Sequence, residues 1–236
     1  MLETPGLHPA SPSIIVFDVN ETLLDITHLE PLFERAFSDR TILREWFAQL
    51  VLYSQTMTLA GLYTPFGELG VGALRMTADI HQVSVTEADI AELKERLSTM
   101  PAHAGAAPAL ARLRVAGFRL VTLTNSAGSA SPTPLQHAGL DHFFERTFSV
   151  ETAGKFKPAP ETYRLVAEEL SVETSDLCLV ACHLWDTLGA QAAGCHSVFV
   201  TRPHNALLPA EGVPHPEIVT PALTTVADEI IAARQS

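Results

Sequence analysis

The sequence predicts an α/β protein in which a doubly wound parallel sheet carries a helical cap inserted after its first strand. Short runs of β-branched and aromatic residues, the first at 14–17, are typical of buried strands. From residue 106 onward such runs alternate with helix-forming segments through short connections, the pattern of a parallel sheet with helices on both faces. Residues 26–100 show no clear strand pattern. The combination predicts a Rossmann-like core with a helical insertion.

The inserted segment spaces its apolar residues as a helix does along most of its length. Residues 26 to about 60 follow this spacing, and Gly61 and Pro65 then interrupt it. Further helices are expected at 68–81 and 87–97, the second of which is rich in helix formers. We therefore predict a core domain made of residues 1–25 and 101–236 and a cap domain made of residues 26–100.

The rest of the core is expected to alternate between strands and helices. Predicted strands cover residues 118–124, 148–150, 177–181 and 197–201. Predicted helices cover residues 107–116, 134–138, 160–170, 187–193 and 222–233. Gly117 and Gly194 follow two of these helices, at the position where glycine commonly ends a helix. Residues 202–216 are rich in Pro, His and Asn and are expected to form a surface loop.

The composition argues against several classes of partner. The chain has 236 residues, a formal net charge of −12 and a pI of about 5.2, so it would repel nucleic acids and anionic membranes. No apolar run approaches the roughly 18 residues that a membrane-spanning helix needs, and residues 1–12 lack the pattern of a signal peptide. Cys178, Cys182 and Cys195 fit free thiols in a reducing compartment. We expect a cytoplasmic protein with a small-molecule partner and leave a homodimer open.

The stretch 13–25 carries the first candidate for chemistry. Asp18 directly follows the apolar run, at the carboxyl end of a strand, where open α/β sheets bind their ligands. A carboxylate there can act as a nucleophile and form a covalent ester that water later cleaves. The alternative is that Asp18 only caps the following turn, since Asp is a common turn former.

Three further polar stretches are expected to meet Asp18 at the same edge of the sheet. Thr124 and Asn125 end an apolar strand and offer hydrogen-bond donors for an anion. Lys157 lies just before two prolines and could direct its ammonium at carboxylates, although a solvated surface lysine is the usual case. Asp186 follows another apolar strand and could instead cap the next helix.

Asp18, Thr22, Lys157 and Asp186 together indicate an active site. A lysine among carboxylates keeps both acids ionised, which suits a nucleophile and a base. In order and spacing, these stretches resemble the haloacid dehalogenase superfamily of hydrolases. Within the superfamily, the chain most resembles the 2-haloacid dehalogenases with a small helical cap, and the resemblance covers nearly its whole length.

The resemblance implies a reaction and a role for each matching residue. Asp18 would attack the carbon that bears the halogen of a short 2-haloacid, and water activated by Asp186 would cleave the ester to leave a hydroxyl. Thr22 and Lys157 would position Asp18. The implied substrate-binding residues are Val19, Asn20, Phe47, Phe66, Thr124, Asn125, Tyr163, His183 and Trp185. Among these, Thr124 would bind the substrate carboxylate and Asn125 the halide, whereas core packing is the alternative for Phe66, Tyr163 and Trp185.

The main alternative within the superfamily is a metal-dependent phosphatase. Those enzymes resemble one another in a second Asp two residues after the nucleophile and in further acids in the fourth stretch that help hold Mg²⁺. Here Asn20 and Cys182 stand at these places, and a thiol is a poor ligand for a hard cation. Lys157 also supplies positive charge without a metal. We therefore expect no metal and no cofactor.

Other positions depart from the dehalogenases. Their cap carries an arginine that reaches the departing halide, and its place falls on Phe47, which cannot hydrogen-bond an anion. Arg44, about one turn earlier, could replace that arginine or could be solvated. His183 stands where the family often has Asn, and Ala181 where it has Ser. These departures leave the substrate open, and a non-catalytic binding protein on the same fold is the third alternative.

Overall fold

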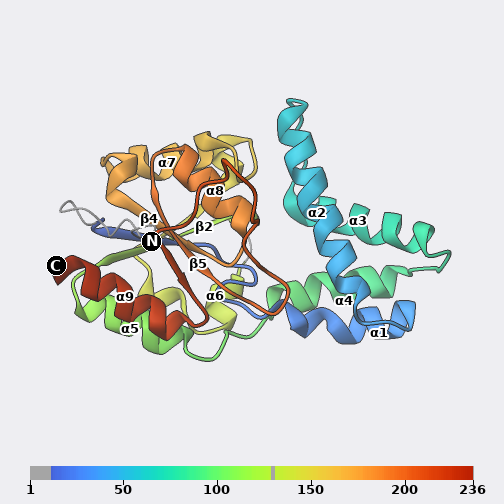
Figure 1. Cartoon of the computed structure of the whole chain (residues 1–236). Helices are drawn as coiled ribbons and strands as arrows, with labels where there is room; N and C mark the ends of the chain where they lie inside the picture. The colour runs from blue at the N-terminus through green and yellow to red at the C-terminus, as the bar shows by residue number, and fades with distance from the viewer. Residues whose placement is uncertain (1–11, 129–130, 236) are drawn as a thin grey trace.

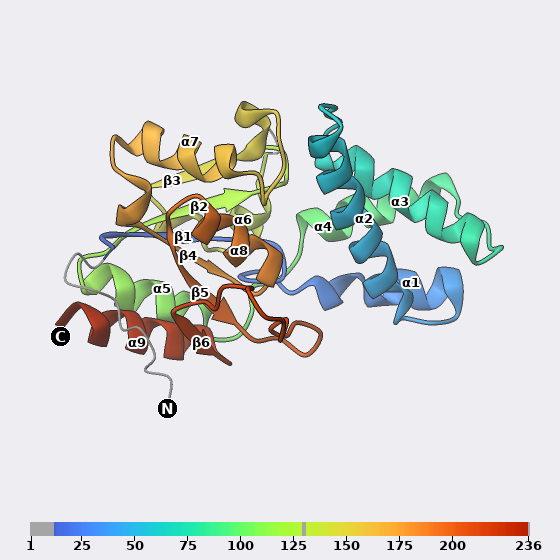
Figure 2. The ribbon, with the colours of Figure 1, turned by 45° about the horizontal axis from the view of Figure 1, so that its top comes forward.

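The computed structural model describes residues 12–128 and 131–235, so the stretch in which we expected no signal peptide lies outside it except for Pro12. Its sheet has six strands, all parallel, in the order β3-β2-β1-β4-β5-β6 (Figures 1 and 2). The strands are β1 (Ile14–Phe17), β2 (Arg119–Thr124), β3 (Arg146–Ser149), β4 (Leu177–Ala181), β5 (His196–Val200) and β6 (Ile218–Thr220). The order reverses between β1 and β4, and ligands of open α/β sheets bind at such a switch point.

The central strand β1 explains why the sheet could be predicted. All four of its residues are buried, and Val16 pairs with Val121 on one side and Leu179 on the other. A parallel strand with helices on both faces must be apolar on both faces, which produces a continuous apolar run rather than an alternating one. The predicted fold class, a doubly wound parallel α/β sheet, is confirmed.

Helices cover both faces of the sheet. Figure 1 shows α5 (Ala106–Val115) and α9 (Leu223–Gln235) on one face, and α7 (Pro160–Leu170) and α8 (Leu184–Ala192) on the other. The short helix α6 (Pro134–His137) follows β2, and four 3₁₀ turns complete the regular structure, at Ile26–Leu29, Asp141–Phe143, Val150–Ala153 and Thr174–Asp176. The crossover helices leave the carboxyl ends of the strands free to carry the site.

Between β1 and β2 the chain forms four helices that lie beyond the carboxyl ends of the strands (Figure 1). We call them the helical group: α1 (Glu30–Phe37), α2 (Ile42–Leu59), α3 (Phe66–Ile80) and α4 (Glu87–Ser98). Their own apolar core includes the buried Trp46, whose Nε1 donates to the carbonyl of Gly70 at 2.9 Å. The two linkers to the sheet run side by side: Asp25 N donates to Pro101 O, and His103 N to Leu23 O, each at 2.8 Å.

The boundaries of the predicted strands and helices differ from the observed ones by at most three residues, and β6 and the later 3₁₀ turns were not predicted. The strand β6 was not predicted, because it has only three residues and pairs with β5 alone at the edge of the sheet. The prediction for α8 was wrong at its start: the helix begins at Leu184 rather than at residue 187. Asp186 therefore lies inside this helix, and the interpretation of Asp186 as its N-cap was also wrong.

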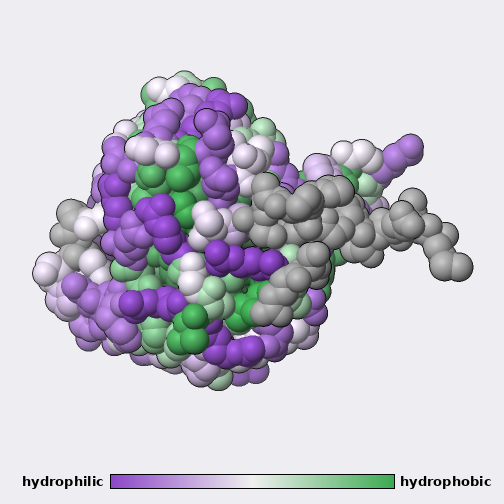
Figure 3. Space-filling view, turned by 90° about the vertical axis from the view of Figure 1, so that its left-hand side faces the viewer, coloured by the Kyte–Doolittle hydropathy of each residue, from purple (hydrophilic) through white to green (hydrophobic). Residues whose placement is uncertain are grey.

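One face of the sheet domain is turned away from the helical group. It shows hydrophilic areas with smaller apolar areas between them (Figure 3).

Cys178, Cys182 and Cys195 are buried and free, as expected. Among the described helices, none is both long and apolar enough to cross a bilayer.

Candidate active site

Asp18 lies at the carboxyl end of β1, and both of its carboxylate oxygens are engaged. Its Oδ1 accepts from Lys157 Nζ at 2.8 Å, and its Oδ2 accepts from Thr22 Oγ1 at 2.6 Å. The Thr22 hydroxyl in turn accepts from the backbone N–H of Cys182 at 3.0 Å, which orients it towards Asp18. These hydrogen bonds fix the Asp18 carboxylate at the switch point of the sheet, and it does not act as a turn cap.

One polar cluster on Asp18, which we call the lysine cluster, consists of Lys157, Asp186 and Tyr163. Besides Asp18, the Lys157 ammonium donates to Asp186 Oδ2 at 2.6 Å and to the carbonyl of Leu123 at 3.0 Å. Tyr163 donates from its hydroxyl to Asp186 Oδ1 at 2.6 Å. Lys157 is 1% exposed, so the interpretation of it as a solvated surface lysine was wrong.

The charged groups of the lysine cluster and Asp18 lie close enough together to shift one another's pKa values. Burial alone would lower the pKa of Lys157, but Asp18 and Asp186 raise it above its ordinary value. Burial raises the pKa of Asp186, which Lys157 opposes. Burial would also raise the pKa of Asp18, yet Lys157 and then His183 lower it well below its ordinary value of 3.8. These contacts therefore favour the ionised form of Asp18.

A close helix contact sets the position of the lysine cluster. A Cβ atom on Gly189 of α8 would lie 2.4 Å from Cβ of Pro158 and 2.7 Å from the Tyr163 hydroxyl. Only glycine lets α8 approach the loop of Lys157 this closely. Sequence reasoning missed Gly189, because a single glycine inside a helix carries no signal of what packs against it.

The helical group also supports the loop that carries Lys157. Thr58 of α2 accepts a hydrogen bond at its Oγ1 from the backbone N–H of Phe156 at 2.9 Å. The Phe156 ring stacks on Tyr63 with centroids 5.1 Å apart and lies 5.8 Å from the Phe66 ring. Phe66 therefore packs against the residue next to Lys157.

A second polar cluster, the histidine cluster, consists of His183, Glu21 and Arg44. His183 Nδ1 lies 3.4 Å from Asp18 Oδ2, and its Nε2 is 2.9 Å from Glu21 Oε2. Glu21 also forms an ion pair with Arg44 of α2. Arg44 is therefore ion-paired with Glu21 rather than simply solvated, and its replacement of the cap arginine stays a prediction.

Sequence reasoning did not find Glu21. Its side chain is 4% exposed, and its backbone has a φ of 65°, a left-handed conformation that non-glycine residues rarely adopt. The one available signal was an acidic residue in the turn after a buried strand. Its partners are 23 and 162 residues away in the sequence, so no local spacing reveals the cluster.

The histidine cluster holds groups of opposite charge next to Asp18. Burial would lower the pKa of His183, but contacts with Cys182, Asp18 and Glu21 raise it well above its ordinary value of 6.5. Burial would raise the pKa of Glu21, but His183 and Arg44 lower it to about 2. The His183 imidazole lies between two aromatic rings, with centroids 5.5 Å from Phe47 and 5.1 Å from Trp185. These contacts favour the protonated form of His183, whose Nδ1 lies 3.4 Å from Asp18 Oδ2.

The remaining predicted substrate residues lie around the same strand ends. Thr124 Oγ1 accepts from the backbone N–H of Ser126, and Asn125 Oδ1 accepts from the backbone N–H of Lys157, at 3.1 and 3.0 Å. The NH₂ group of Asn125 remains as its donor end. Val19, which is buried, contributes its carbonyl to the turn that contains Glu21.

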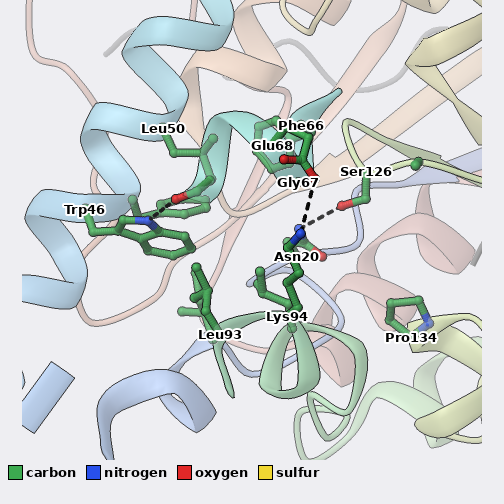
Figure 4. Close-up of a pocket in the computed structure, with 15 residues that line it drawn as sticks. Asn20, Trp46, Leu50, Phe66, Gly67, Glu68, Leu93, Lys94, Ser126 and Pro134 are labelled. Carbon is green, nitrogen blue, oxygen red and sulfur yellow. Dashed lines mark hydrogen bonds and ion pairs between the residues drawn. The ribbon is translucent and has the colours of Figure 1, made fainter. Parts of the chain in front are cut away.

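A cavity of about 270 Å³, which we call cavity 1, opens between the helical group and the sheet (Figure 4). Trp46, Phe47, Leu50 and Phe66 give it apolar walls, and at the sheet side Asn20 donates to Ser126 Oγ at 3.3 Å. The Lys94–Glu68 ion pair, 3.2 Å long, also lines it. Asp18 is not in its lining, but Asn20 belongs to the turn that follows Asp18.

A second cavity of about 530 Å³, cavity 2, lies on the other side of Phe47. Phe47 lines both cavities and so forms part of the wall between them. Besides apolar residues of α2, its lining includes Glu21, Arg44, His183, Trp185, His204 and Asn205. The histidine cluster therefore faces a different space from cavity 1.

The side chains at the site offer little to a hard divalent cation. In the part of the chain that the structure describes, Asp18, Cys182 and His183 place one ligand-type atom each within 4.8 Å of one another. A cation there would have to compete with the Lys157 ammonium for Asp18 and with Glu21 for His183. A thiol and an imidazole also suit soft metals better than Mg²⁺.

The fold and the site together are those of an α/β hydrolase with a doubly wound sheet. The helical group is inserted after its first strand. The sequence model of the haloacid dehalogenase-like hydrolases matches residues 12–194. The chain belongs to the haloacid dehalogenase-like hydrolase family, and the superfamily expected from the sequence is confirmed.

Individual relatives of this chain are haloacid and haloacetate dehalogenases. The (S)-2-haloacid dehalogenase 2 of Pseudomonas sp. (strain CBS-3) is 29% identical over 194 residues, covering 81% of this chain and 84% of the relative. Haloacetate dehalogenase H-2 of Moraxella sp. (strain B) is 28% identical over 195 residues, covering 80% and 85%. The structure of L-2-haloacid dehalogenase from Xanthobacter autotrophicus with chloropropionic acid covalently bound has a TM-score of 0.82 and 25% identity, covering 92% of this chain and 97% of that one.

Proposed function

We propose that the protein replaces the halogen of a short 2-haloacid with a hydroxyl through an ester on Asp18. The observation that carries this proposal is the buried Asp18 carboxylate, held by Lys157 and Thr22 at 2.8 and 2.6 Å at the switch point of the sheet. The similarity to haloacid dehalogenases, one of which has chloropropionic acid covalently bound, supports the same chemistry here.

The reaction begins with displacement at carbon. An oxygen of Asp18 forms a bond to the carbon that bears the halogen, and the halide leaves with the bonding electron pair. Lys157 keeps Asp18 ionised, which the reaction requires. Cavity 1 receives the carbon chain of the substrate against Phe47 and Phe66, which line it. Thr124 and Asn125, which precede the lining residue Ser126, would bind the carboxylate and the halide.

Residues 26–100 act as the cap over this site, and residues 1–25 and 101–236 as the core. The position of the helical group beyond the strand ends supports this division. A phosphatase would need an acid at Asn20 and further acids near Cys182, and neither position supplies one. A cytoplasmic location and a homodimeric assembly stay predictions from the sequence.

Substrate assays test the proposal. Halide release from 2-chloropropionate and phosphate release from p-nitrophenyl phosphate are to be measured with and without EDTA. We expect halide release that EDTA leaves unchanged and no phosphate release. Phosphate release that depends strictly on Mg²⁺ would contradict the proposal.

The nucleophile is tested by Asp18→Asn, which keeps the shape of the side chain and removes its charge. Turnover should be abolished while the far-ultraviolet circular dichroism stays unchanged, and single turnover of the unchanged enzyme in ¹⁸O water should place label in Asp18 first. Asp25→Asn is the matched control, because Asp25 lies in the same loop and accepts from the N–H and the hydroxyl of Thr27, at 2.9 and 2.7 Å. Normal turnover of Asp18→Asn would reject the assignment.

A further inference from the structure

Under the proposed function cavity 1 accepts an anion, and one described residue of its lining carries a positive charge. The substrate has a carboxylate, whereas the chain itself has a formal net charge of −12. Among the described residues that line cavity 1, the charged ones are Lys94 of α4 and Glu68 of α3, which form an ion pair 3.2 Å long. Figure 4 shows Lys94 extending from α4 towards Glu68. Lys94 is thus the described cation that an anion would meet inside cavity 1.

The other cations near Asp18 are already engaged. A lysine ammonium has three N–H donors, and Lys157 directs its ammonium at two carboxylates and one carbonyl. Arg44 and His183 pair with Glu21 and line cavity 2 rather than cavity 1. None of these three side chains therefore supplies an unengaged charge to cavity 1.

The Lys94–Glu68 pair is loose enough to exchange one carboxylate for another. Its 3.2 Å separation exceeds the roughly 2.7–2.9 Å of a short hydrogen bond between charged groups. The two side chains are 54% and 61% exposed, and exposed pairs contribute little to stability. In the described part of the chain Glu68 is the one partner of the Lys94 ammonium, which has three donors. Replacing Glu68 on Lys94 by the carboxylate of a ligand should therefore cost little.

We propose that Lys94 binds the carboxylate of the acid in cavity 1, and that Glu68 holds the same ammonium while the cavity is empty. The inference rests on the dehalogenation proposed above and names a specificity-determining residue for it. Thr124 would meet the carboxylate from the sheet and Lys94 from the helical group. One carboxylate can accept from both, because its oxygens offer about four lone-pair positions. The positive charge on the side of the helical group then comes from α4.

The consequence is a preference for acids over neutral halides of the same shape. An amide such as 2-chloropropionamide matches 2-chloropropionate in size but has no charge with which to displace Glu68 from Lys94. The carboxylate keeps its charge while the halide leaves, so Lys94 contributes equally to binding of the substrate and of the transition state. Lys94 should therefore affect KM rather than kcat.

The test measures binding without turnover. Calorimetric titration of Asp18→Asn with 2-chloropropionate gives the Kd of the acid, and Lys94→Gln and Glu68→Gln are added to this background. Lys94→Gln should weaken binding of the acid by on the order of tenfold, the loss expected for one hydrogen bond between charged groups. Glu68→Gln removes the competing carboxylate and should tighten binding by roughly 2–5-fold.

The opposite signs separate a binding role from a structural one. Both substitutions break the same ion pair, so a pair that only braced α3 against α4 would change the Kd in the same direction in both variants. Equal signs, or an unchanged Kd in Lys94→Gln, would overturn the inference. Binding of 2-chloropropionamide should stay the same in both variants. An equal loss for the amide and the acid would assign the effect to the shape of cavity 1 and would also overturn it.

Lys155→Gln is the matched control, because it removes the same formal charge from a lysine that pairs with Glu161 and does not line cavity 1. Its Kd for the acid should equal that of the Asp18→Asn background. In the enzyme with Asp18 intact, Lys94→Gln should raise KM for 2-chloropropionate by the factor seen in Kd and leave kcat unchanged. A fall in kcat with KM unchanged would contradict a role in binding the carboxylate.

The outcomes also distinguish this inference from the proposed function. If the unchanged enzyme releases halide while Lys94→Gln keeps the Kd of the acid, the inference alone fails. If the unchanged enzyme releases no halide but the two variants shift the Kd in opposite directions, the proposed reaction fails and Lys94 remains the residue that binds acids. If the folded Asp18→Asn protein, as judged by circular dichroism, binds no 2-chloropropionate, the inference is overturned whatever the halide assay shows.

Discussion

The two clusters that meet at Asp18 differ in where their residues come from. All three residues of the lysine cluster belong to the sheet domain, and all are at most 2% exposed. The histidine cluster crosses from the sheet domain to α2 through Arg44 and lines cavity 2. One carboxylate is therefore shared between a closed set of contacts, which is buried within the sheet domain, and an open set, which lines cavity 2.

The largest effect is expected from Lys157→Met, which removes the ion pairs of the lysine cluster with Asp18 and Asp186. Met fills a similar volume but leaves Asp18 and Asp186 without their common cation. The pKa of Asp18 should rise, and turnover should fall by roughly 10²–10³-fold, by comparison with the loss of one electrostatic donor at an active site. Breaking a buried ion pair should also lower the free energy of unfolding by about 3–5 kcal/mol, measured by urea titration.

Lys155→Met provides the matched control for that change. The Lys155 side chain is 43% exposed and pairs with Glu161 at the surface. Exposed pairs of this kind contribute about 0–1 kcal/mol, so stability and turnover should stay close to those of the unchanged protein. Equal turnover in Lys157→Met and Lys155→Met would remove the distinction between the closed and open clusters.

The stability that the histidine cluster contributes should depend on pH. The pKa of Glu21 is lowered from 4.5 to about 2, so its contribution to stability is complete above pH 4.5 and is lost as the pH falls towards 2. The raised pKa of His183 has the opposite sign: its contribution is complete below pH 6.5 and is lost as the pH rises through the raised value. Both contributions are complete between pH 4.5 and 6.5.

Urea titrations between about pH 2 and 5 measure the acid side of this window. The free energy of unfolding should fall less steeply with acid in Glu21→Gln than in the unchanged protein, by on the order of 3 kcal/mol over the range. Glu87→Gln, which alters an exposed carboxylate paired with Arg75, serves as the control and should keep the slope. Identical slopes in all three proteins would contradict the low pKa of Glu21.

The smallest effect is expected from Gly189→Ala, which disturbs the packing under the lysine cluster without removing any of its charges. The added methyl group would meet Pro158 and the Tyr163 hydroxyl, and overpacking of this kind costs about 1–3 kcal/mol. Turnover should fall, because Pro158 adjoins Lys157. Gly72→Ala on α3 meets no atom within 4 Å and should gain up to about 1 kcal/mol. Thermal unfolding that ranks the two variants in the reverse order would show that the contact is not tight.

The lysine cluster could be predicted from the sequence, whereas the histidine cluster could not. Asp18 and Asp186 follow apolar runs that mark strands, and Lys157 lies just before two prolines, so their convergence could be predicted. Glu21 and Arg44 could not be joined to His183, because their meeting depends on how α2 packs over the sheet. The missed strand β6 has the same cause: three residues acquire strand structure only by pairing with β5.

The contact between Thr58 and the backbone of Phe156 links the two parts of the molecule. The helical group holds the residue next to Lys157 by a 2.9 Å hydrogen bond and by a ring stacked on Tyr63. A rotation of the helices away from the sheet would break both contacts and release the loop that presents the ammonium. Any motion that separates the helices from the sheet would therefore also loosen the loop that holds Lys157 against Asp18.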